Sequence, residues 1–312
     1  MRKIGFIFPS QSTQYVGMGK DLYENIAICR ETFDHANEVT GVDIKGICFD
    51  GPLETLNETV NTQPCILTMS YAAFLALGEY GIKADAVAGF SLGEFSAMVA
   101  GGIMSFDDAL RVLKVRATAM QTAVPLGVGT MIGVKSEKAA RAIEICNEIT
   151  EGYTALANAN SPTNLLFSGE TPAMKIFSER LTAEGIKNRI VAVSVPSHCD
   201  LMNPARQPLT DALAAADMKA PDGVDFYMCA DAEKEADVAK IREKEVTQMC
   251  TTVQCEGIIR NMLRDGVNVF VELGPKNAYS RYVREVAPEG TLILNVEDVA
   301  SLQATVAALQ AE

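Results

Sequence analysis

The order of apolar and amphipathic segments predicts an α/β fold, with a large domain built on a mostly parallel sheet and a small ferredoxin-like subdomain inserted into it. Short apolar runs alternate with helix-like stretches along most of the chain, as parallel sheets require. One run, Ala86-Val87-Ala88, leads into Gly89-Phe90-Ser91-Leu92-Gly93, which has the strand–turn–helix pattern of a nucleophile elbow. Between residues 128 and 195 the predicted order becomes β-α-β-β-α-β, the split βαβ pattern.

Length, charge and cysteine content limit the class of protein. The 312 residues are 48% hydrophobic, enough for a sizeable core. A net charge of −13 argues against nucleic acid as a partner. The eight cysteines follow no metal-binding or disulfide spacing. No apolar run approaches membrane-spanning length and no signal segment precedes residue 4, so we expect a cytoplasmic protein without a membrane partner.

The large domain is predicted over residues 1–125 and 198–312. Its first strand, 4–8, is apolar on both faces, as in a buried parallel strand, and ends at Pro9. The polar loop that follows lies at the carboxyl end of that strand, where open α/β sheets hold their sites. The remaining large-domain strands are predicted at 86–88, 224–229, 267–273 and 291–295, and the helices at 20–36, 62–76, 94–100, 106–122, 201–216, 236–264 with a break near 251–252, 278–286 and 301–309.

The inserted subdomain is predicted over residues 126–197. Its period-2 segments predict strands, and the longer amphipathic segments between them predict helices. The strands are expected at 128–134, 154–159, 165–168 and 188–195, and the helices at 136–150 and 171–185.

Ser91 is the candidate nucleophile, although a plain βα turn with an exposed serine would give the same pattern. A serine needs a base, and the chain has two histidines. His35 lies on a charged helix face, whereas His198 follows a predicted strand at the junction of the two domains. His198 is therefore the base by elimination, unless it is a structural histidine. No carboxylate stands out as its partner, so a backbone carbonyl or an amide side chain is the alternative.

Two further features surround this pair. In an elbow, one oxyanion donor is the backbone N–H after the nucleophile, here that of Leu92. The loop after Phe8, which contains Gln11, is the natural source of a second donor. Arg116 falls in the apolar stripe of its helix, where a charge is costly unless paired. A structural salt bridge, a snorkelling side chain or a bidentate clamp for a carboxylate each accounts for it.

Several motifs in order resemble the malonyl-CoA:acyl-carrier-protein transacylases, the acyltransferases of fatty-acid and polyketide synthesis. Residues 8–14 read FPSQSTQ where the family has FPGQGSQ, and residues 89–94 read GFSLGE where it has GHSLGE. Arg116 stands where the family keeps a carboxylate-binding arginine. The other matches are Thr62-Gln63-Pro64, Asn160-Ser161-Pro162, Ser194 to Cys199 as SVPSHC, and Val271 to Pro275 as VELGP.

The resemblance implies an α/β-hydrolase-like large domain and ping-pong transfer of malonyl from coenzyme A to the phosphopantetheine thiol of acyl carrier protein. It implies a Ser91 acyl-enzyme, an oxyanion hole from Gln11 and Leu92, and a partner of His198 at Gln254. Substrate contacts are implied at Arg116, Asn160 and Asn164. It implies malonyl-CoA as substrate and an acidic carrier protein as partner. We expect no cofactor or metal, a monomer, and docking of the carrier protein on a local basic patch whose candidates are Lys187, Arg189, Lys276, Arg281 and Arg284.

Departures from the family pattern leave other functions open. Phe90 replaces the usual histidine before the nucleophile, and Ser10 and Ser12 replace glycines. If those glycines need positive φ, serine strains the loop that supplies an oxyanion donor. The alternatives are another acyl group, service to a polyketide synthase, a serine thioesterase or hydrolase, and a non-catalytic module that binds carrier protein.

Overall fold

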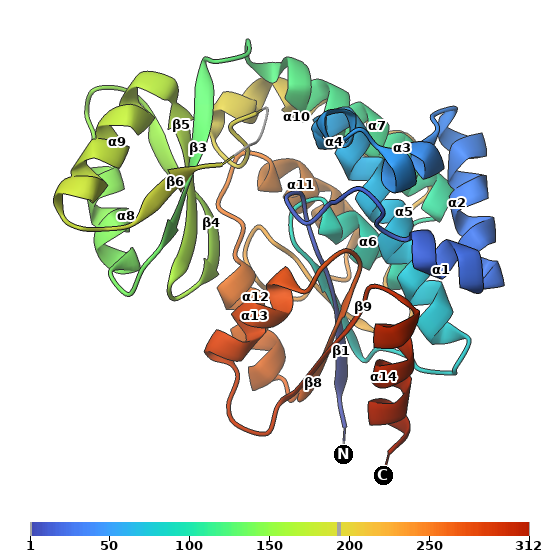
Figure 1. The fold of residues 1–312 in the computed structure, drawn as a ribbon. Coiled ribbons are helices and arrows are strands. Elements are labelled where there is room, and N and C mark those ends of the chain that lie inside the picture. The colour runs from blue at the N-terminus through green and yellow to red at the C-terminus, as the bar shows by residue number, and fades with distance from the viewer. Residues whose placement is uncertain (1, 192–194, 312) are drawn as a thin grey trace.

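A five-stranded parallel sheet forms the centre of the large domain in the computed structural model, which describes residues 2–191 and 195–311. The strand order is β7-β2-β1-β8-β9, and all four neighbouring pairs are parallel. Strands β1, β8 and β9 can be followed in Figure 1. The strands are β1 (Ile4–Phe8), β2 (Ala86–Gly89), β7 (Asp225–Tyr227), β8 (Val269–Leu273) and β9 (Leu292–Val296). The register pairs Phe8 with Gly89, so the loop after β1 and the turn after β2 leave the sheet side by side.

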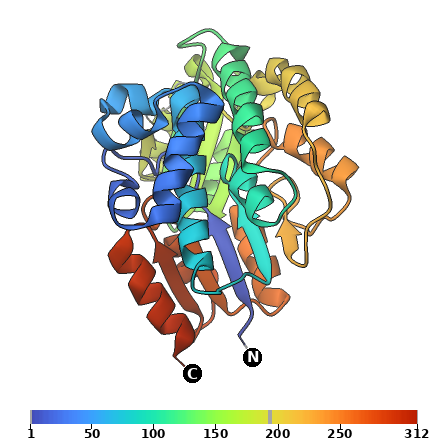
Figure 2. The same cartoon turned by 90° about the vertical axis from the view of Figure 1, so that its right-hand side faces the viewer.

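Helices cover both faces of this sheet. The large domain contains α1 (Lys20–Asn25), α2 (Ala27–Thr40), α3 (Ile44–Asp50), α4 (Leu53–Asn57), α5 (Thr59–Gly78), α6 (Gly93–Ala100), α7 (Phe106–Ala123), the 3-10 helix η1 (Asp200–Ala205), α10 (Arg206–Ala215), α11 (Val238–Gln248), α12 (Cys255–Arg264), α13 (Ala278–Val286) and α14 (Val299–Gln310). The two termini lie at the same end of the molecule (Figure 2).

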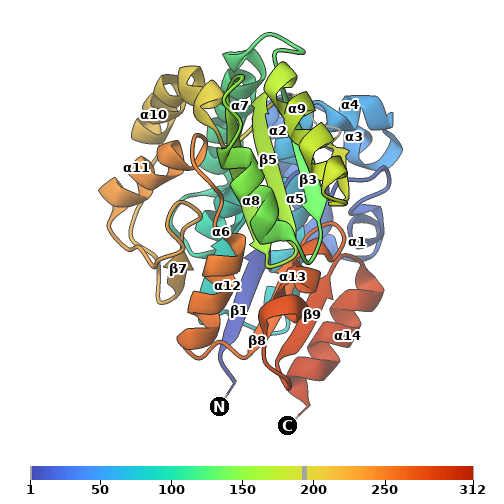
Figure 3. The ribbon, with the colours of Figure 1, turned by 90° about the vertical axis from the view of Figure 1, so that its left-hand side faces the viewer.

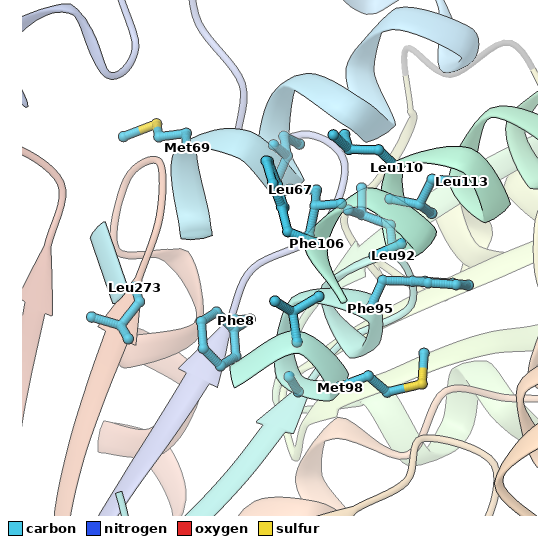
Figure 4. Packing of buried hydrophobic residues seen from close by; sticks show 14 of the residues in the cluster. Phe8, Leu67, Met69, Leu92, Phe95, Met98, Phe106, Leu110, Leu113 and Leu273 are labelled. Atoms are coloured by element: carbon cyan, nitrogen blue, oxygen red, sulfur yellow. The ribbon is translucent and has the colours of Figure 1, made fainter. Parts of the chain in front are cut away.

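Alternate side chains of the central strands point into two separate hydrophobic cores on opposite faces of the sheet. Phe6 and Phe8 of β1 point into the larger core, which α2, α5, α6 and α7 complete. Figure 4 shows Phe8 in this core together with Leu92 and Phe95, which come from the elbow and its helix. Ile7 points to the opposite face, into the core formed with α12 and α13. A strand buried on both faces therefore explains the continuous apolar run in the sequence.

A second, antiparallel sheet forms the small subdomain. It contains β3 (Gly129–Lys135), β4 (Thr154–Ser161), β5 (Asn164–Glu170) and β6 (Asn188–Ile190) in the order β4-β5-β3-β6, the order of a ferredoxin-like sheet. Its own core packs against α8 (Ala139–Asn147) and α9 (Thr171–Ala183). All its strands lie within residues 126–197, and among the described residues of that range none belongs to the parallel sheet. The predicted fold class is confirmed.

Strand β4 joins the two parts of the molecule. Val253, just before α12, forms a parallel bridge with Asn158 of β4, and its N–H and C=O bond to Ala157 and Ala159 at 2.8 and 3.0 Å. Helices α12 and α13 both contact β4, so the small sheet lies against them (Figure 3). Within the described ranges, no helix combines the length and apolar character needed to cross a membrane.

Element boundaries differ from the predictions at a few places. The helix predicted from residue 62 begins at Thr59, so Pro64 lies inside α5 rather than at its start. The helix predicted over 20–36 is divided at Ile26, whose backbone is extended, and α3 and α4 have no predicted counterpart. Of the strand predicted over 188–195, β6 ends at Ile190, and residues 192–194, with Ser194 of the SVPSHC motif, lie outside the described residues.

Candidate active site

Steric crowding at the end of β2 explains the two glycines of the elbow. A Cβ on Gly89 would lie 1.9 Å from the carbonyl oxygen of Gly93, and one on Gly93 would lie 2.3 Å from that of Phe8. Ser91 itself adopts a left-handed φ of 56°, a strained conformation for a non-glycine residue that often occurs at functional sites. The turn therefore brings the serine close to the loop after β1.

Ser91 and His198 form a hydrogen-bonded pair. His198 Nε2 lies 2.8 Å from Ser91 Oγ, and Nδ1 lies 2.8 Å from the backbone carbonyl oxygen of Gln248. That carbonyl accepts from Nδ1–H and so leaves Nε2 as the acceptor for the serine proton. His35, by contrast, is exposed and bonds Asp107.

The prediction that Gln254 lies beside the histidine is wrong. Gln254 is the N-cap of α12, and its backbone N–H donates to Cys229. Gln248 takes that place because it is the last residue of α11, and the carbonyls of a helix's last turn have no intrahelical partner.

Burial controls the charge of His198. The side chain is enclosed. This desolvation, with the nearby positive charge of Arg116, lowers the pKa of His198 to about 4, although the hydrogen bond that Nδ1–H donates to the Gln248 carbonyl acts to raise it. The imidazole is therefore neutral near pH 7, as a general base must be.

Arg116 on α7 lies directly against Ser91. It is fully buried, which excludes a snorkelling side chain, and no carboxylate forms a salt bridge with it among the described residues. Its Nη2 lies 3.3 Å from Ser91 Oγ and 3.1 Å from Oε1 of the Gln248 side chain. Nε and Nη1 have no hydrogen-bond partner within the described part of the chain. Two buried donors are thus free for an anionic ligand.

The loop after β1 supplies the other side of the site. The backbone N–H groups of Gln11 and Leu92 have no partner among the described residues, as an oxyanion hole requires. The side chain of Gln11 is held by Gln63 Nε2 at 3.0 Å. Ser12 has φ of 77°, so the predicted strain falls on this serine; Ser10 is absent from the described residues with positive φ.

Two cavities meet at this loop. The inner cavity, of about 60 Å³, is lined by Ser91, His198, Gln11, Met131, Leu166 and Tyr279. The outer cavity, of about 820 Å³, opens between the small sheet and α13. Its wall includes the predicted Asn160 and Asn164, where Asn160 Nδ2 donates to Asn164 Oδ1 at 3.1 Å. The inner cavity has room for about two water molecules at their liquid volume of about 30 Å³ each, which limits it to short groups.

Phe90 and Tyr279 lie between the inner cavity and the core that Ile7 forms with α12 and α13. The two rings stack with centroids 4.3 Å apart, and Phe90 is fully buried. Tyr279 lines both cavities. Glu272 holds the start of α13 by accepting from the N–H groups of Tyr279 and Ser280 at 3.2 and 2.6 Å.

Several residues of the site were not predicted from the sequence. Cys229 donates its Sγ–H to the Gly89 carbonyl at 2.9 Å and accepts from the Ser91 N–H at 3.4 Å, so it supports the elbow. Gln248 carries a sequence signal in retrospect, because it ends a helix just before the Thr251-Thr252 break. The sequence carries no comparable signal for Tyr279 or Cys229. No cluster of histidine, cysteine or carboxylate side chains suited to a metal ion occurs in the described ranges.

Comparison with known proteins agrees with this geometry. Residues 5–307 match the family profile of the acyl transferase domain. A malonyl CoA-acyl carrier protein transacylase of Bacillus subtilis is 37% identical over 289 residues, covering 92% of this chain and 91% of the relative. The chain belongs to this family of acyl transferases.

Solved structures of family members share the whole fold. The malonyl CoA-acyl carrier protein transacylase of Clostridium perfringens superposes with a TM-score of 0.93 at 34% identity, covering 99% of this chain and 97% of that one. A malonyl-transacylase solved in complex with a type II polyketide synthase acyl-carrier protein has a TM-score of 0.93 at 31% identity, covering 98% of this chain and 99% of that one.

Proposed function

We propose that the chain transfers a malonyl group from malonyl-CoA to the phosphopantetheine thiol of acyl carrier protein through a Ser91 acyl-enzyme. The observation that carries this proposal is the position of Arg116, whose Nη2 lies 3.3 Å from Ser91 Oγ. Two of its other donors are buried without a partner among the described residues. A guanidinium in this position binds a carboxylate at the far end of a short acyl group on Ser91.

The first half-reaction forms the acyl-enzyme. His198 Nε2 takes the proton from Ser91 Oγ as the oxygen attacks the malonyl thioester carbon. The negative oxygen of the tetrahedral intermediate accepts from the N–H groups of Gln11 and Leu92. The C–S bond then breaks, and the coenzyme A thiolate takes the proton from His198. The Gln248 carbonyl holds the imidazolium through its Nδ1–H during these steps.

The second half-reaction transfers the acyl group to the carrier protein. His198 takes the proton of the phosphopantetheine thiol as its sulfur attacks the malonyl ester, and the proton returns to Ser91 Oγ when the C–O bond breaks. The outer cavity is the route for both pantetheine arms, with Asn160 and Asn164 on its wall. The proposed reaction needs no cofactor.

The mouth of this route offers a docking surface for an acidic carrier protein. Lys187, Arg189 and Arg281 line the outer cavity, and none of them forms a salt bridge among the described residues. Because the chain as a whole carries a net charge of −13, binding of an acidic partner to other parts of its surface is disfavoured by repulsion. Of the five candidate residues, these three are the ones that we propose contact the carrier protein.

Labelled malonyl-CoA tests the proposal. Protein isolated after incubation with it should carry label, holo acyl carrier protein should remove that label, and Ser91→Ala should carry none. Rapid release of free malonate without carrier protein would instead indicate a hydrolase, and absence of an adduct would indicate a non-catalytic module. In a second assay, Arg116→Ala should weaken malonyl transfer much more than acetyl transfer; equal losses would contradict the role of Arg116.

A further inference from the structure

A pair of buried carboxyl groups lies beneath Ser91, and the proposed acyl-transfer steps do not use it. Glu94 on α6 and Glu245 on α11 are both fully buried. The side-chain nitrogen of Gln248 donates to Glu94 Oε2 and lies 3.4 Å from Glu245 Oε1. Two carboxyl groups that reach the same nitrogen cannot both ionise in a buried site, because their charges repel each other. One proton is therefore shared between them.

The remaining contacts place the negative charge of the pair. Glu94 Oε1 accepts from the backbone N–H of Cys229 at 2.9 Å, whereas Glu245 Oε2 has no partner in the described part of the chain. Burial, and then the charge of Glu94, raise the pKa of Glu245 well above its ordinary value. Glu94 has the better set of donors, so the shared proton rests mainly on Glu245.

Arg116 balances this charge before a ligand binds. The groups that face the pair are Arg116 on α7 and the thiols of Cys229 and Cys255, and His198 lies close to Arg116. His198 is neutral near pH 7, and burial keeps both thiols protonated by raising their pKa. Gln248 links the charges, because its Oε1 accepts from Arg116 while its nitrogen donates to the carboxyl pair. One cation and one shared negative charge leave this cluster neutral.

A malonyl carboxylate disturbs that balance. Its natural ligands are the Nε and Nη1 donors of Arg116, which are buried without a partner among the described residues. Once it binds there, one guanidinium faces two negative charges in a site without bulk solvent, and an uncompensated buried charge is strongly unfavourable. Protonation of the second carboxyl group of the pair restores neutrality. An acetyl group brings no charge and requires no such proton.

We propose that binding of the malonyl carboxylate to Arg116 is coupled to uptake of one proton from solvent by the Glu94–Glu245 pair. The inference rests on the proposed function, because it takes malonyl-CoA as the ligand. It makes the pair a specificity-determining element: the empty site holds its own counter-charge for Arg116, and only a carboxylated acyl group displaces that charge.

Proton uptake on binding is measurable without acyl transfer. The Ser91→Ala protein would be titrated with malonyl-CoA and with acetyl-CoA at pH 7, by calorimetry in two buffers of different ionisation enthalpy. The coenzyme A phosphates are common to both ligands, so their protons cancel in the difference. We expect the protein to take up about one proton more when it binds malonyl-CoA than when it binds acetyl-CoA. The Kd for malonyl-CoA should therefore rise up to about tenfold per pH unit above neutrality, whereas the Kd for acetyl-CoA should not.

Removal of both carboxyl groups tests the assignment. In Ser91→Ala/Glu94→Gln/Glu245→Gln, the extra proton uptake should disappear and malonyl-CoA should bind with no added pH dependence. A matched control, Ser91→Ala/Glu179→Gln, changes an exposed carboxylate on α9 and should keep the extra proton. The measurements on Ser91→Ala alone test the coupling even if the triple variant does not fold.

The outcomes separate this inference from the proposed function. Equal proton uptake for the two ligands, with malonyl-CoA bound, would overturn the coupling and leave the function intact. An extra proton that persists in a folded triple variant would overturn the assignment to this pair. Failure of the Ser91→Ala protein to bind malonyl-CoA would overturn the proposed function and the inference together.

Discussion

Phe90 stacks face to face on Tyr279, with ring centroids 4.3 Å apart and planes within 3° of parallel. Phe90 precedes Ser91, and Tyr279 lies in the first turn of α13 and lines both cavities. The residue that departs from the family's GHSLGE motif therefore has a partner. Tyr279 lines the inner cavity and Phe90 packs against its ring, so the stack supports that part of the cavity wall.

A double-mutant cycle measures this pairing. Phe90→Leu and Tyr279→Leu each remove one ring but keep an apolar side chain, and each should lower the free energy of unfolding by about 1–3 kcal/mol. The double variant should lose about 1 kcal/mol less than the sum, because aromatic stacking adds about that much beyond burial. Urea denaturation gives all four values. Strict additivity would contradict an energetically coupled stack.

The pH dependence of malonyl transfer should reflect the buried state of His198. Burial lowers the pKa of His198 from 6.5 to about 4 in the folded protein, and only the neutral imidazole can accept a proton from Ser91. We expect kcat/KM for malonyl-CoA to show no loss due to His198 between about pH 8 and 5, and a decline below that range. A stopped-flow pH profile checks this. A His-dependent loss already centred near pH 6.5 would contradict it, and His35→Ala, on an exposed side chain, is the control.

The same shift affects stability with a definite sign. Between about pH 4 and 6.5 the folded protein binds fewer protons at His198 than the unfolded chain does. Stability contributed by the neutral, buried imidazole is therefore present above pH 6.5 and is lost as the pH falls toward 4. His198→Gln should reduce this acid dependence in unfolding experiments.

Local steric patterns made most of the catalytic pair predictable. Gly89 and Gly93 are required by contacts with their own neighbours, so the elbow is visible in five residues of sequence. His198 could be chosen because only two histidines exist. The parallel sheet followed from strands that are apolar on both faces, since such strands must be covered by helices.

Contacts made by backbone atoms and buried charges were not predictable in the same way. Gln248 orients His198 through a carbonyl that every residue possesses, so no side-chain type identifies it. Glu245 follows Glu243 and Lys244 in a helix and resembles a solvated residue, yet it is fully buried. Burial of a charge depends on which helices pack together, and that information is not local.

Gln248 and Gln254 should differ sharply when substituted. Gln248→Leu keeps the carbonyl that accepts from His198 but removes the amide oxygen that holds Arg116 at 3.1 Å. A hydrogen bond to a charged group contributes about 1.5–3 kcal/mol, so malonyl transfer should fall about 10- to 100-fold in kcat/KM, and acetyl transfer by less. Gln254→Ala, at the N-cap of α12, should change both by less than about twofold. Steady-state kinetics with both donors would decide; similar losses at the two positions would contradict the role of the Gln248 side chain in holding Arg116.

Charge reversal should locate the carrier-protein surface. The three basic residues that line the outer cavity are Lys187, Arg189 and Arg281. Replacing any one of them by glutamate should raise the KM for acyl carrier protein several-fold at low salt, because repulsion replaces attraction. The effect should shrink as salt is added. Lys175→Glu, an exposed change on α9, introduces the same charge away from the cavity. If Lys175→Glu raises the KM as much as the others, net charge rather than a local surface governs docking.

Ser12 provides a test of backbone strain in the oxyanion loop. Its φ of 77° lies in the left-handed region, which costs a non-glycine residue about 1–2 kcal/mol, whereas glycine adds about 0.5–1 kcal/mol of chain entropy to the cost of folding. Ser12→Gly keeps the backbone N–H that donates to Gln14 Oε1 at 2.7 Å, so it should stabilise the protein by about 0.5–1 kcal/mol. Ser10→Gly is the matched control, because Ser10 is not among the described residues with positive φ; it should destabilise by a similar amount. Thermal and urea unfolding of the two variants should therefore move in opposite directions, and destabilisation by both would show that Ser12 carries no strain.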